Sequence, residues 1–260
     1  MVRGPKLSVN VNKVATVRNS RGGREPNLLH AVAVCIEAGA YGITVHPRAD
    51  ERHITRKDVY EIAAALEGRR TSIEYNIEGD PRPDWLKMVH EVKPHQATLV
   101  PVMPGEVTSH VGYTRANTPD SLKDTIAKLQ DDGIRVSLFI DNDLESVDWA
   151  AELKPKRVEL YTEPFARAFE QSEEAARVSY GRYVRAALRA AEHGLEINAG
   201  HDLDHENLVM FRDLPHLKEV SIGHAIISRA IFDGLRPVVK DYLHVLAGAR
   251  VLAPGEASQS

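Results

Sequence analysis

The sequence predicts an α/β protein, a (β/α)8 TIM barrel, and three observations support this fold class. The chain has 260 residues, a usual length for a single barrel of this kind. Short β-rich runs alternate with helical patterns eight times along the chain. Parallel strands need helical crossovers, and eight such units can close into a barrel. A doubly wound open sheet is the alternative, because periodicity does not distinguish an open sheet from a closed one.

The elements follow from local patterns in chain order. Strands are predicted at 7–11, 42–45, 72–76, 97–100, 136–140, 157–161, 196–199 and 219–222. Helices are predicted at 26–37, 56–66, 83–92, 119–131, 144–153, 173–193, 205–212 and 225–247. Gly39 and Gly194 each end a helical pattern just before a strand, which predicts short left-handed turns. Asp58, three residues after Thr55, predicts a capping box at the start of the helix at 56–66.

Composition limits the possible partners. Hydrophobic residues make up 43% of the chain, and 33 basic against 37 acidic residues give a net charge of −4. This mild acidity predicts neither nucleic acid nor anionic membrane as a partner. The single cysteine, Cys35, excludes an intrachain disulfide framework and fits a cytoplasmic location. We expect one barrel domain over residues 1–250 and a disordered tail over 251–260.

Polar side chains gather at the predicted strand ends. Because barrel active sites form at the carboxyl ends of the strands, these residues are the candidate site. In chain order they are Asn10, Asn12, Lys13, Arg21, His46, Arg48, His53, Glu74, Glu159, His201, Asp202, Gly223 and His224, and a long loop at 102–118 adds Thr108.

The residue types in this set suit proton transfer and anion binding. His46 can exchange protons near neutral pH, and the guanidinium of Arg48 matches a phosphate group. Gly223 and His224 open a predicted helix, whose free N–H groups can bind an anion. Glu74 lies inside a strand pattern, where a carboxylate is costly unless it is functional or paired. The alternative for Glu74 is a structural ion pair with a neighbouring strand.

Motifs for metals and nucleotides are not found in the sequence. It contains no His-Glu-x-x-His pattern, paired-cysteine motif, acid-rich calcium loop, Walker loop or Gly-x-Gly-x-x-Gly after the first strand. His46 and His201 could serve as zinc ligands only through an arrangement that the sequence does not reveal. We therefore expect neither a metal nor a nucleotide cofactor.

Several strings resemble the pyridoxine 5′-phosphate synthase family, from about residue 7 to residue 246 and in the same order. They are VNVNKVATVRNSRG (9–22), GITVHPR (42–48), RHIT (52–55), VSLFID (136–141), NAGH (198–201) and IGHAII (222–227). The resemblance implies a barrel with additional helices that assembles as a homo-octamer. It also implies condensation of 1-deoxy-D-xylulose 5-phosphate with 3-amino-2-oxopropyl phosphate, which releases phosphate and water without a cofactor.

The resemblance also implies roles for individual residues. His46 matches the general base, Glu74 a second acid–base group and His201 a proton donor, while Glu159 matches a carboxylate that stabilises the transition state. The aminoketone phosphate would bind at Asn10, Arg21, Gly223 and His224. The pentulose phosphate would bind at Arg48, His53 and Thr108, with Asn12, Lys13 and Asp202 nearby.

This chain departs from the family pattern at three places. Many members carry Asp-His where this chain has Asn12-Lys13, and a glycine where it has Asp202; the loop at 102–118, the expected lid, also differs. We interpret these differences as a subgroup variation. Two other functions remain open: a sugar-phosphate aldolase or isomerase that uses Lys13 as its nucleophile, and a non-catalytic oligomer that binds phosphorylated ligands.

Overall fold

Eight parallel strands form a closed barrel in chain order in the computed structural model, which describes residues 4–102 and 111–248. The strands are β1 (Lys6–Asn10), β2 (Gly42–Val45), β3 (Glu74–Gly79), β4 (Gln96–Leu99), β5 (Arg135–Ile140), β6 (Arg157–Tyr161), β7 (Glu196–Gly200) and β8 (Leu217–Ile222). Strand β8 pairs with β1 and closes the sheet. This closure confirms the barrel and excludes the open doubly wound sheet.

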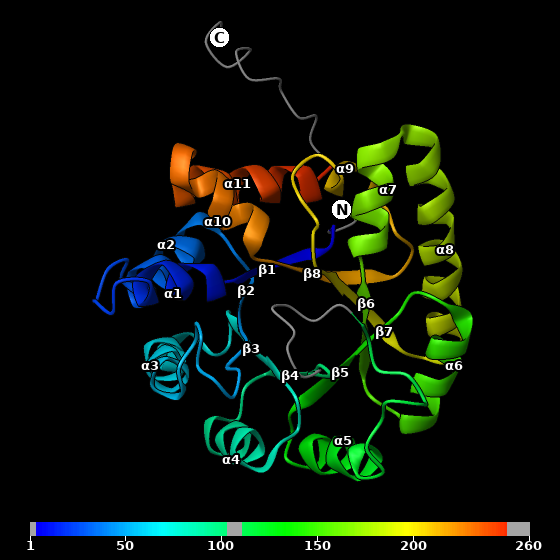
Figure 1. Ribbon diagram of the computed structural model, residues 1–260, viewed down its shortest axis with the longest axis horizontal. Helices are drawn as coiled ribbons and strands as arrows, with labels where there is room; N and C mark the ends of the chain where they lie inside the picture. The colour runs from blue at the N-terminus through cyan, green and yellow to red at the C-terminus, as the bar shows by residue number, and fades with distance from the viewer. Residues whose placement is uncertain (1–3, 103–110, 249–260) are drawn as a thin grey trace, which may run out of the picture.

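The helices lie outside the strands (Figure 1). They are α1 (Asn12–Asn19), α2 (Leu28–Ala38), α3 (Arg56–Leu66), α4 (Pro83–Val92), α5 (Leu122–Asp131), α6 (Leu144–Leu153), α7 (Glu163–Gln171), α8 (Glu173–Glu192), α9 (Leu208–Phe211), α10 (His224–Asp233) and α11 (Leu235–Leu246). In the described parts of the chain, no helix is both long enough and apolar enough to cross a membrane. The tail expected at 251–260 lies outside the described residues.

The helices differ from the expected pattern in three places. Helix α1 follows β1 directly and α7 follows β6 directly, and neither was predicted from the sequence. Short amphipathic helices next to a strand end are hard to separate from loops by periodicity. The single helix expected at 225–247 is two helices, because Gly234 adopts φ 84° between α10 and α11.

Local signals at the helix ends are confirmed. Gly39 ends α2 in the left-handed region with φ 110°, and Gly194 has φ 75° before β7. Thr55 and Asp58 form the predicted capping box at the start of α3, with each side chain bonded to the other's backbone N–H. These contacts satisfy backbone donors that the first turn of a helix leaves without partners.

Strand β3 shows how side chains divide between the two faces of the barrel. Tyr75 and Ile77 are buried in the apolar core between the sheet and the helices, together with Trp85 of α4. Asn76, on the other face, bonds to Thr44 and Thr98 of the neighbouring strands. Successive side chains of a strand point to opposite faces, so Glu74, Asn76 and Glu78 all face the barrel interior. The strand extends to Gly79, beyond the end expected at residue 76.

Candidate active site

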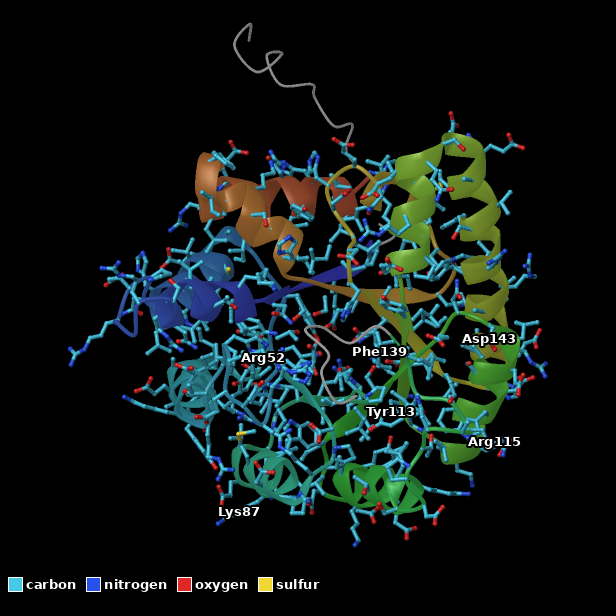
Figure 2. All side chains as sticks on the ribbon, in the orientation of Figure 1. Arg52, Lys87, Tyr113, Arg115, Phe139 and Asp143 are labelled. Carbon is cyan, nitrogen blue, oxygen red and sulfur yellow. The ribbon has the colours of Figure 1, made fainter. Side chains whose placement is uncertain are left out.

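A cavity of about 500 Å³ opens at the carboxyl ends of the strands. It is lined by eleven of the residues predicted from the sequence: Asn10, Asn12, Lys13, His46, Arg48, His53, Glu159, His201, Asp202, Gly223 and His224. Figure 2 places Phe139 near the centre of the barrel and Lys87 of α4 at its periphery. The tertiary structure therefore brings together residues that are spread over more than two hundred positions of the sequence.

His46 and Glu78 form the buried centre of the cavity. His46 directly follows β2, and its Nδ1 atom lies 3.7 Å from Oε2 of Glu78, near the end of β3. Asn10 of β1 donates to the same carboxylate oxygen at 3.3 Å. Burial raises the pKa of Glu78 to about 8. Burial is the largest cause that holds the pKa of His46 well below its usual range, and the neighbouring His53 and Arg48 lower it further. At neutral pH the two groups are thus an uncharged acid and an uncharged base.

Glu159 of β6 provides a second buried carboxyl in the cavity. Burial raises its pKa well above the ordinary value, and the neighbouring carboxyl group of Glu78 raises it further. A Cβ atom at Gly200 of β7 would lie only 2.8 Å from Oε1 of Glu159. Only glycine at position 200 therefore leaves this carboxyl in place, which explains the Ala-Gly pair before His201.

His201 lies on an aromatic surface at the edge of the cavity. Its ring centroid is 5.3 Å from that of Phe139 and 5.5 Å from that of Tyr161. The backbone at His201 has φ 75°, an uncommon conformation for a residue other than glycine. The hydroxyl of Thr162 donates to the carbonyls of Gly200 and His201, which holds this turn. Such a conformation often marks a functional position.

Two parts of the cavity suit anions. Gly223 precedes α10, and a Cβ atom there would lie 2.9 Å from the backbone oxygen of Asn10, so glycine lets the helix start approach β1. The first N–H groups of α10 can bind an anion. Elsewhere in the cavity lining, Lys13 and Arg48 add positive charge near His53. Burial and these charges lower the pKa of His53 to about 4.

The expectation that Glu74 belongs to the site is corrected by the structure. Glu74 is the first residue of β3 and is not among the residues that line the cavity. Its Oε1 atom lies 2.5 Å from Arg135 and 3.9 Å from Arg157. Arg157 also pairs with Glu219 at 3.2 Å. Glu74 therefore belongs to a buried ion-pair cluster at the opposite end of the barrel. This is the structural role of the alternative interpretation, but the partners lie on β5 and β6 and not on a neighbouring strand.

Other residues also lie differently from the sequence prediction. Arg21 follows α1 and is exposed outside the cavity, and Thr108 lies outside the described residues. The sequence prediction missed several lining residues, among them Glu78, Tyr161, Ser221, and the α7 residues Glu163 and Arg167. Glu163 and Arg167 form an ion pair at 2.9 Å. The only sign in the sequence that Glu163 and Arg167 could line the cavity was their position soon after the strand predicted at 157–161.

No group of three or more His, Cys, Asp or Glu side chains is arranged to hold a metal ion within residues 4–102 and 111–248. The buried acid and base groups of the cavity are suited to proton transfer. Two places beside them are suited to anion binding: the start of α10 and the positively charged side chains near His53.

The chain is similar to known proteins over nearly its whole length. The family model described as "Pyridoxal phosphate biosynthesis protein PdxJ" matches residues 7–248. A pyridoxine 5′-phosphate synthase from Leptospira biflexa is 49% identical over 252 residues, which cover 93% of this chain and 97% of the relative. One from Porphyromonas gingivalis is 46% identical over 243 residues, covering 93% and 99%.

The fold is also similar to that of proteins with solved structures. A phosphoribosylanthranilate isomerase from Thermotoga maritima aligns with a TM-score of 0.59 and 13% identity over 94% of this chain and 99% of that chain. At that identity the likeness concerns the barrel alone. The match to the family model and the two relatives spans nearly the whole chain, so the protein belongs to the PdxJ family of pyridoxal phosphate biosynthesis proteins.

Proposed function

We propose that the protein is a pyridoxine 5′-phosphate synthase that condenses 1-deoxy-D-xylulose 5-phosphate with 3-amino-2-oxopropyl phosphate. The observation that carries this proposal is the buried pair of His46 and Glu78, 3.7 Å apart, in a cavity that Glu159 and His201 also line. Joining an amine to a ketone, followed by loss of water and phosphate, requires several proton transfers at defined positions. Family membership supports the same reaction.

The proton carriers divide by their environment. His46, whose pKa is lowered, is proposed as the general base. Glu78, whose pKa is about 8, takes the role of second acid–base group that was expected at Glu74. His201 is proposed as the proton donor, and Glu159 stabilises the transition state through its carboxyl group. Groups whose environments move their pKa values apart can serve as acid and base at one pH.

Two phosphorylated substrates need two anion sites. We assign the aminoketone phosphate to Asn10 and to the start of α10 at Gly223 and His224. The pentulose phosphate is assigned to Arg48 and His53, with Asn12, Lys13 and Asp202 lining the same cavity. A helix start and a guanidinium are both suited to phosphate oxygens.

The test is an assay with both substrates that follows pyridoxine 5′-phosphate and released phosphate together, with His46→Ala as the control. Equal amounts of both products from the parent protein, and no product from the variant, would support the synthase function. No product from folded protein would reject it. Borohydride trapping of a substrate on Lys13 would then support the aldolase instead.

We also propose that the chain is a single domain that assembles as a homo-octamer. Ile231 and Phe232 of α10 are 71% and 88% exposed, which is unusual for such large apolar side chains and fits a surface covered by another copy. Light scattering on the purified protein measures the assembly directly, and a monomeric mass would reject it. The cytoplasmic location stays a prediction.

A further inference from the structure

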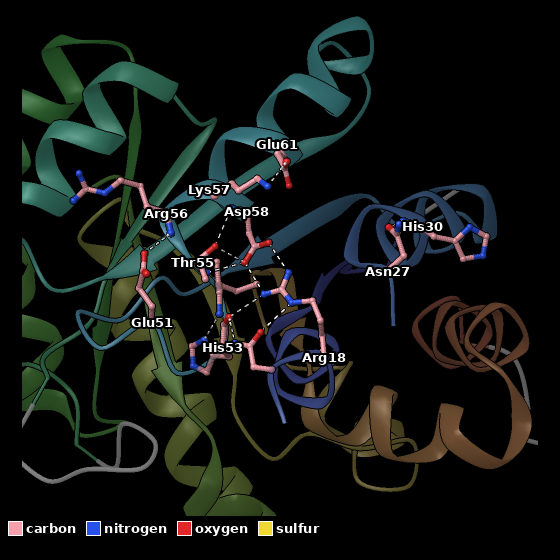
Figure 3. A network of polar contacts seen from close by, with 12 residues as sticks. Arg18, Asn27, His30, Glu51, His53, Thr55, Arg56, Lys57, Asp58 and Glu61 are labelled. Atoms are coloured by element: carbon pink, nitrogen blue, oxygen red, sulfur yellow. Dashed lines mark hydrogen bonds and ion pairs between the residues drawn. The ribbon is translucent and has the colours of Figure 1, made fainter. Parts of the chain in front are cut away.

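A buried ion pair joins α1 to the start of α3 (Figure 3). Arg18 of α1 donates to both carboxylate oxygens of Asp58, at 2.6 and 2.8 Å. The two side chains are only 14% and 6% exposed. Two parallel charge-assisted hydrogen bonds fix orientation as well as distance. Asp58 lies forty positions after Arg18, and the chain between them includes β2 and the loop that follows it, so this pair is a tertiary contact.

The same contacts hold the peptide group between His53 and Ile54. Arg18 and Asn19 donate to the carbonyl oxygen of His53, at 3.3 and 2.8 Å. The N–H of Ile54 donates to Nδ1 of the His53 ring at 2.8 Å. In a trans peptide the C=O and N–H groups point in opposite directions. Holding the carbonyl against α1 therefore directs the N–H toward the ring.

This arrangement determines which ring nitrogen of His53 carries the proton. A neutral imidazole has one donor and one acceptor nitrogen. Because Nδ1 accepts from Ile54, the proton of the neutral ring is on Nε2. Burial and the charges of Lys13, Arg48 and Arg52 lower the pKa of His53 to about 4, so the ring is neutral at pH 7. The ring lines the cavity and can offer one N–H to an acceptor.

Helix α1 is tied to the same loop at its other end. The side-chain oxygen of Asn12 accepts from the backbone N–H of His46 at 3.0 Å. Asn12 and Lys13 line the cavity from α1, whereas Arg48 and His53 line it from the loop. The spacing between these two sets of side chains thus depends on both ties. Arg18 does not itself line the cavity.

We propose that Arg18 is a positioning residue that acts through Asp58 and the His53 carbonyl to hold His53 as an Nε2–H donor toward the phosphorylated pentulose. The identity of that substrate rests on the proposed function. The role of Arg18 does not, because the contacts that define it are within the protein. Arg18 and Asp58 touch no reacting atom, and their effect is on substrate placement.

The kinetic test uses Arg18→Lys and Asp58→Asn. Lysine keeps the charge but lacks the planar fork, and asparagine keeps an acceptor for the capping box. We expect the KM for the pentulose phosphate to rise about tenfold in both variants, with kcat within about twofold and the KM for the aminoketone phosphate unchanged. Unchanged KM values for both substrates would overturn the proposal.

A matched control separates positioning from stability. Arg189 of α8 makes a similar two-oxygen contact with Asp148 of α6, at 2.6 and 3.2 Å, away from the cavity. These two side chains are more exposed than those of Arg18 and Asp58, at 41% and 43%, so Arg189→Lys should lower the Tm only slightly and should change neither KM. If this variant raises the pentulose phosphate KM as much as Arg18→Lys does, the effect is a general loss of stability and the proposal is wrong.

A substrate-free measurement keeps the inference distinct from the synthase assignment. Nitrogen-15 NMR of histidine-labelled protein reports which ring nitrogen is protonated. The parent should show His53 as the Nε2–H form, and Arg18→Lys should shift its signals toward a mixture of the two tautomers. The same His53 signals in parent and variant would overturn the positioning role. If the parent makes no product but the tautomer shift occurs, the proposed function fails while the role of Arg18 stands.

Discussion

The imidazole Nδ1 of His46 and the carboxyl Oε2 of Glu78 lie 3.7 Å apart in the buried part of the cavity. The gap is slightly too long for a direct hydrogen bond. Both groups are uncharged at neutral pH, because burial raises the pKa of Glu78 and lowers that of His46. The cavity therefore holds an available base and an available acid side by side, which suits a reaction with repeated proton transfers.

Glu78→Gln should reduce kcat by about 10² to 10⁴-fold, the usual contribution of a general acid or base. Glutamine keeps the shape of the side chain and can still accept from Asn10, so the fold should be retained. The measurement is the steady-state rate together with circular dichroism. Glu74→Gln is the control, since Glu74 lies outside the cavity. A larger loss of kcat in Glu74→Gln than in Glu78→Gln would show that Glu74, and not Glu78, is the second acid–base group.

Glu74→Gln should act on stability. The substitution removes the negative charge that faces Arg135 at 2.5 Å and Arg157 at 3.9 Å. Breaking a buried ion pair by removing one partner costs about 3 kcal/mol or more. Urea denaturation measures this loss. Glu61→Gln, which breaks the exposed pair with Lys57, should cost less than about 1 kcal/mol. Equal losses in the two variants would contradict the structural role of Glu74.

The pH dependence of the free energy of unfolding should show that the buried carboxyl group of Glu78 is protonated in the folded protein. The ordinary pKa of a glutamate is 4.5, and that of Glu78 is about 8. Between these pH values the unfolded chain releases the Glu78 proton while the folded protein keeps it. The contribution of Glu78 to stability is therefore fully present below pH 4.5 and is lost as the pH rises to about 8.

Denaturation of the parent and Glu78→Gln at several pH values tests this directly. The free energy of unfolding of the parent, relative to the variant, should fall by up to about 1.4 kcal/mol per pH unit across that window. The difference should level off at higher pH. A difference that stays constant from pH 5 to pH 8 would show that the carboxyl of Glu78 is not held protonated.

Gly223→Ala should disturb the start of α10. The added Cβ atom would lie 2.9 Å from the backbone oxygen of Asn10 and 3.0 Å from its Cβ atom, and neither can move without shifting β1. Overpacking of this kind costs about 1 to 3 kcal/mol. We expect the KM for the aminoketone phosphate to rise, because the proposed anion site lies at this helix start. Gly68→Ala, where the added atom meets nothing within 4 Å, is the control. Equal kinetic effects of the two substitutions would reject the close approach as their cause.

Local patterns in the sequence were sufficient to predict eight parallel strands with helical crossovers and most of the residues that line the cavity, whereas the closure of the sheet was established by the pairing of β8 with β1. Eight alternations of strand and helix require a parallel sheet, and the carboxyl ends of its strands meet at one end of a barrel. That rule alone places His46, Glu159 and His201 in one cavity, as the structure does. The capping box at Thr55 and Asp58 was also predictable, because it depends on residues three apart.

The choice between Glu74 and Glu78 depended on tertiary structure. The two residues are four positions apart on one strand, so both point into the barrel and no periodicity separates them. What separates them is the strand's pairing: Glu74 lies opposite Gly42 at the start of β2, whereas Ile77 lies opposite Val45 at its end. Glu74 thus meets Arg135 and Glu78 meets His46. The ion pair of Arg18 with Asp58 was likewise beyond sequence analysis, because the contact forms only after the chain between them has folded into the barrel.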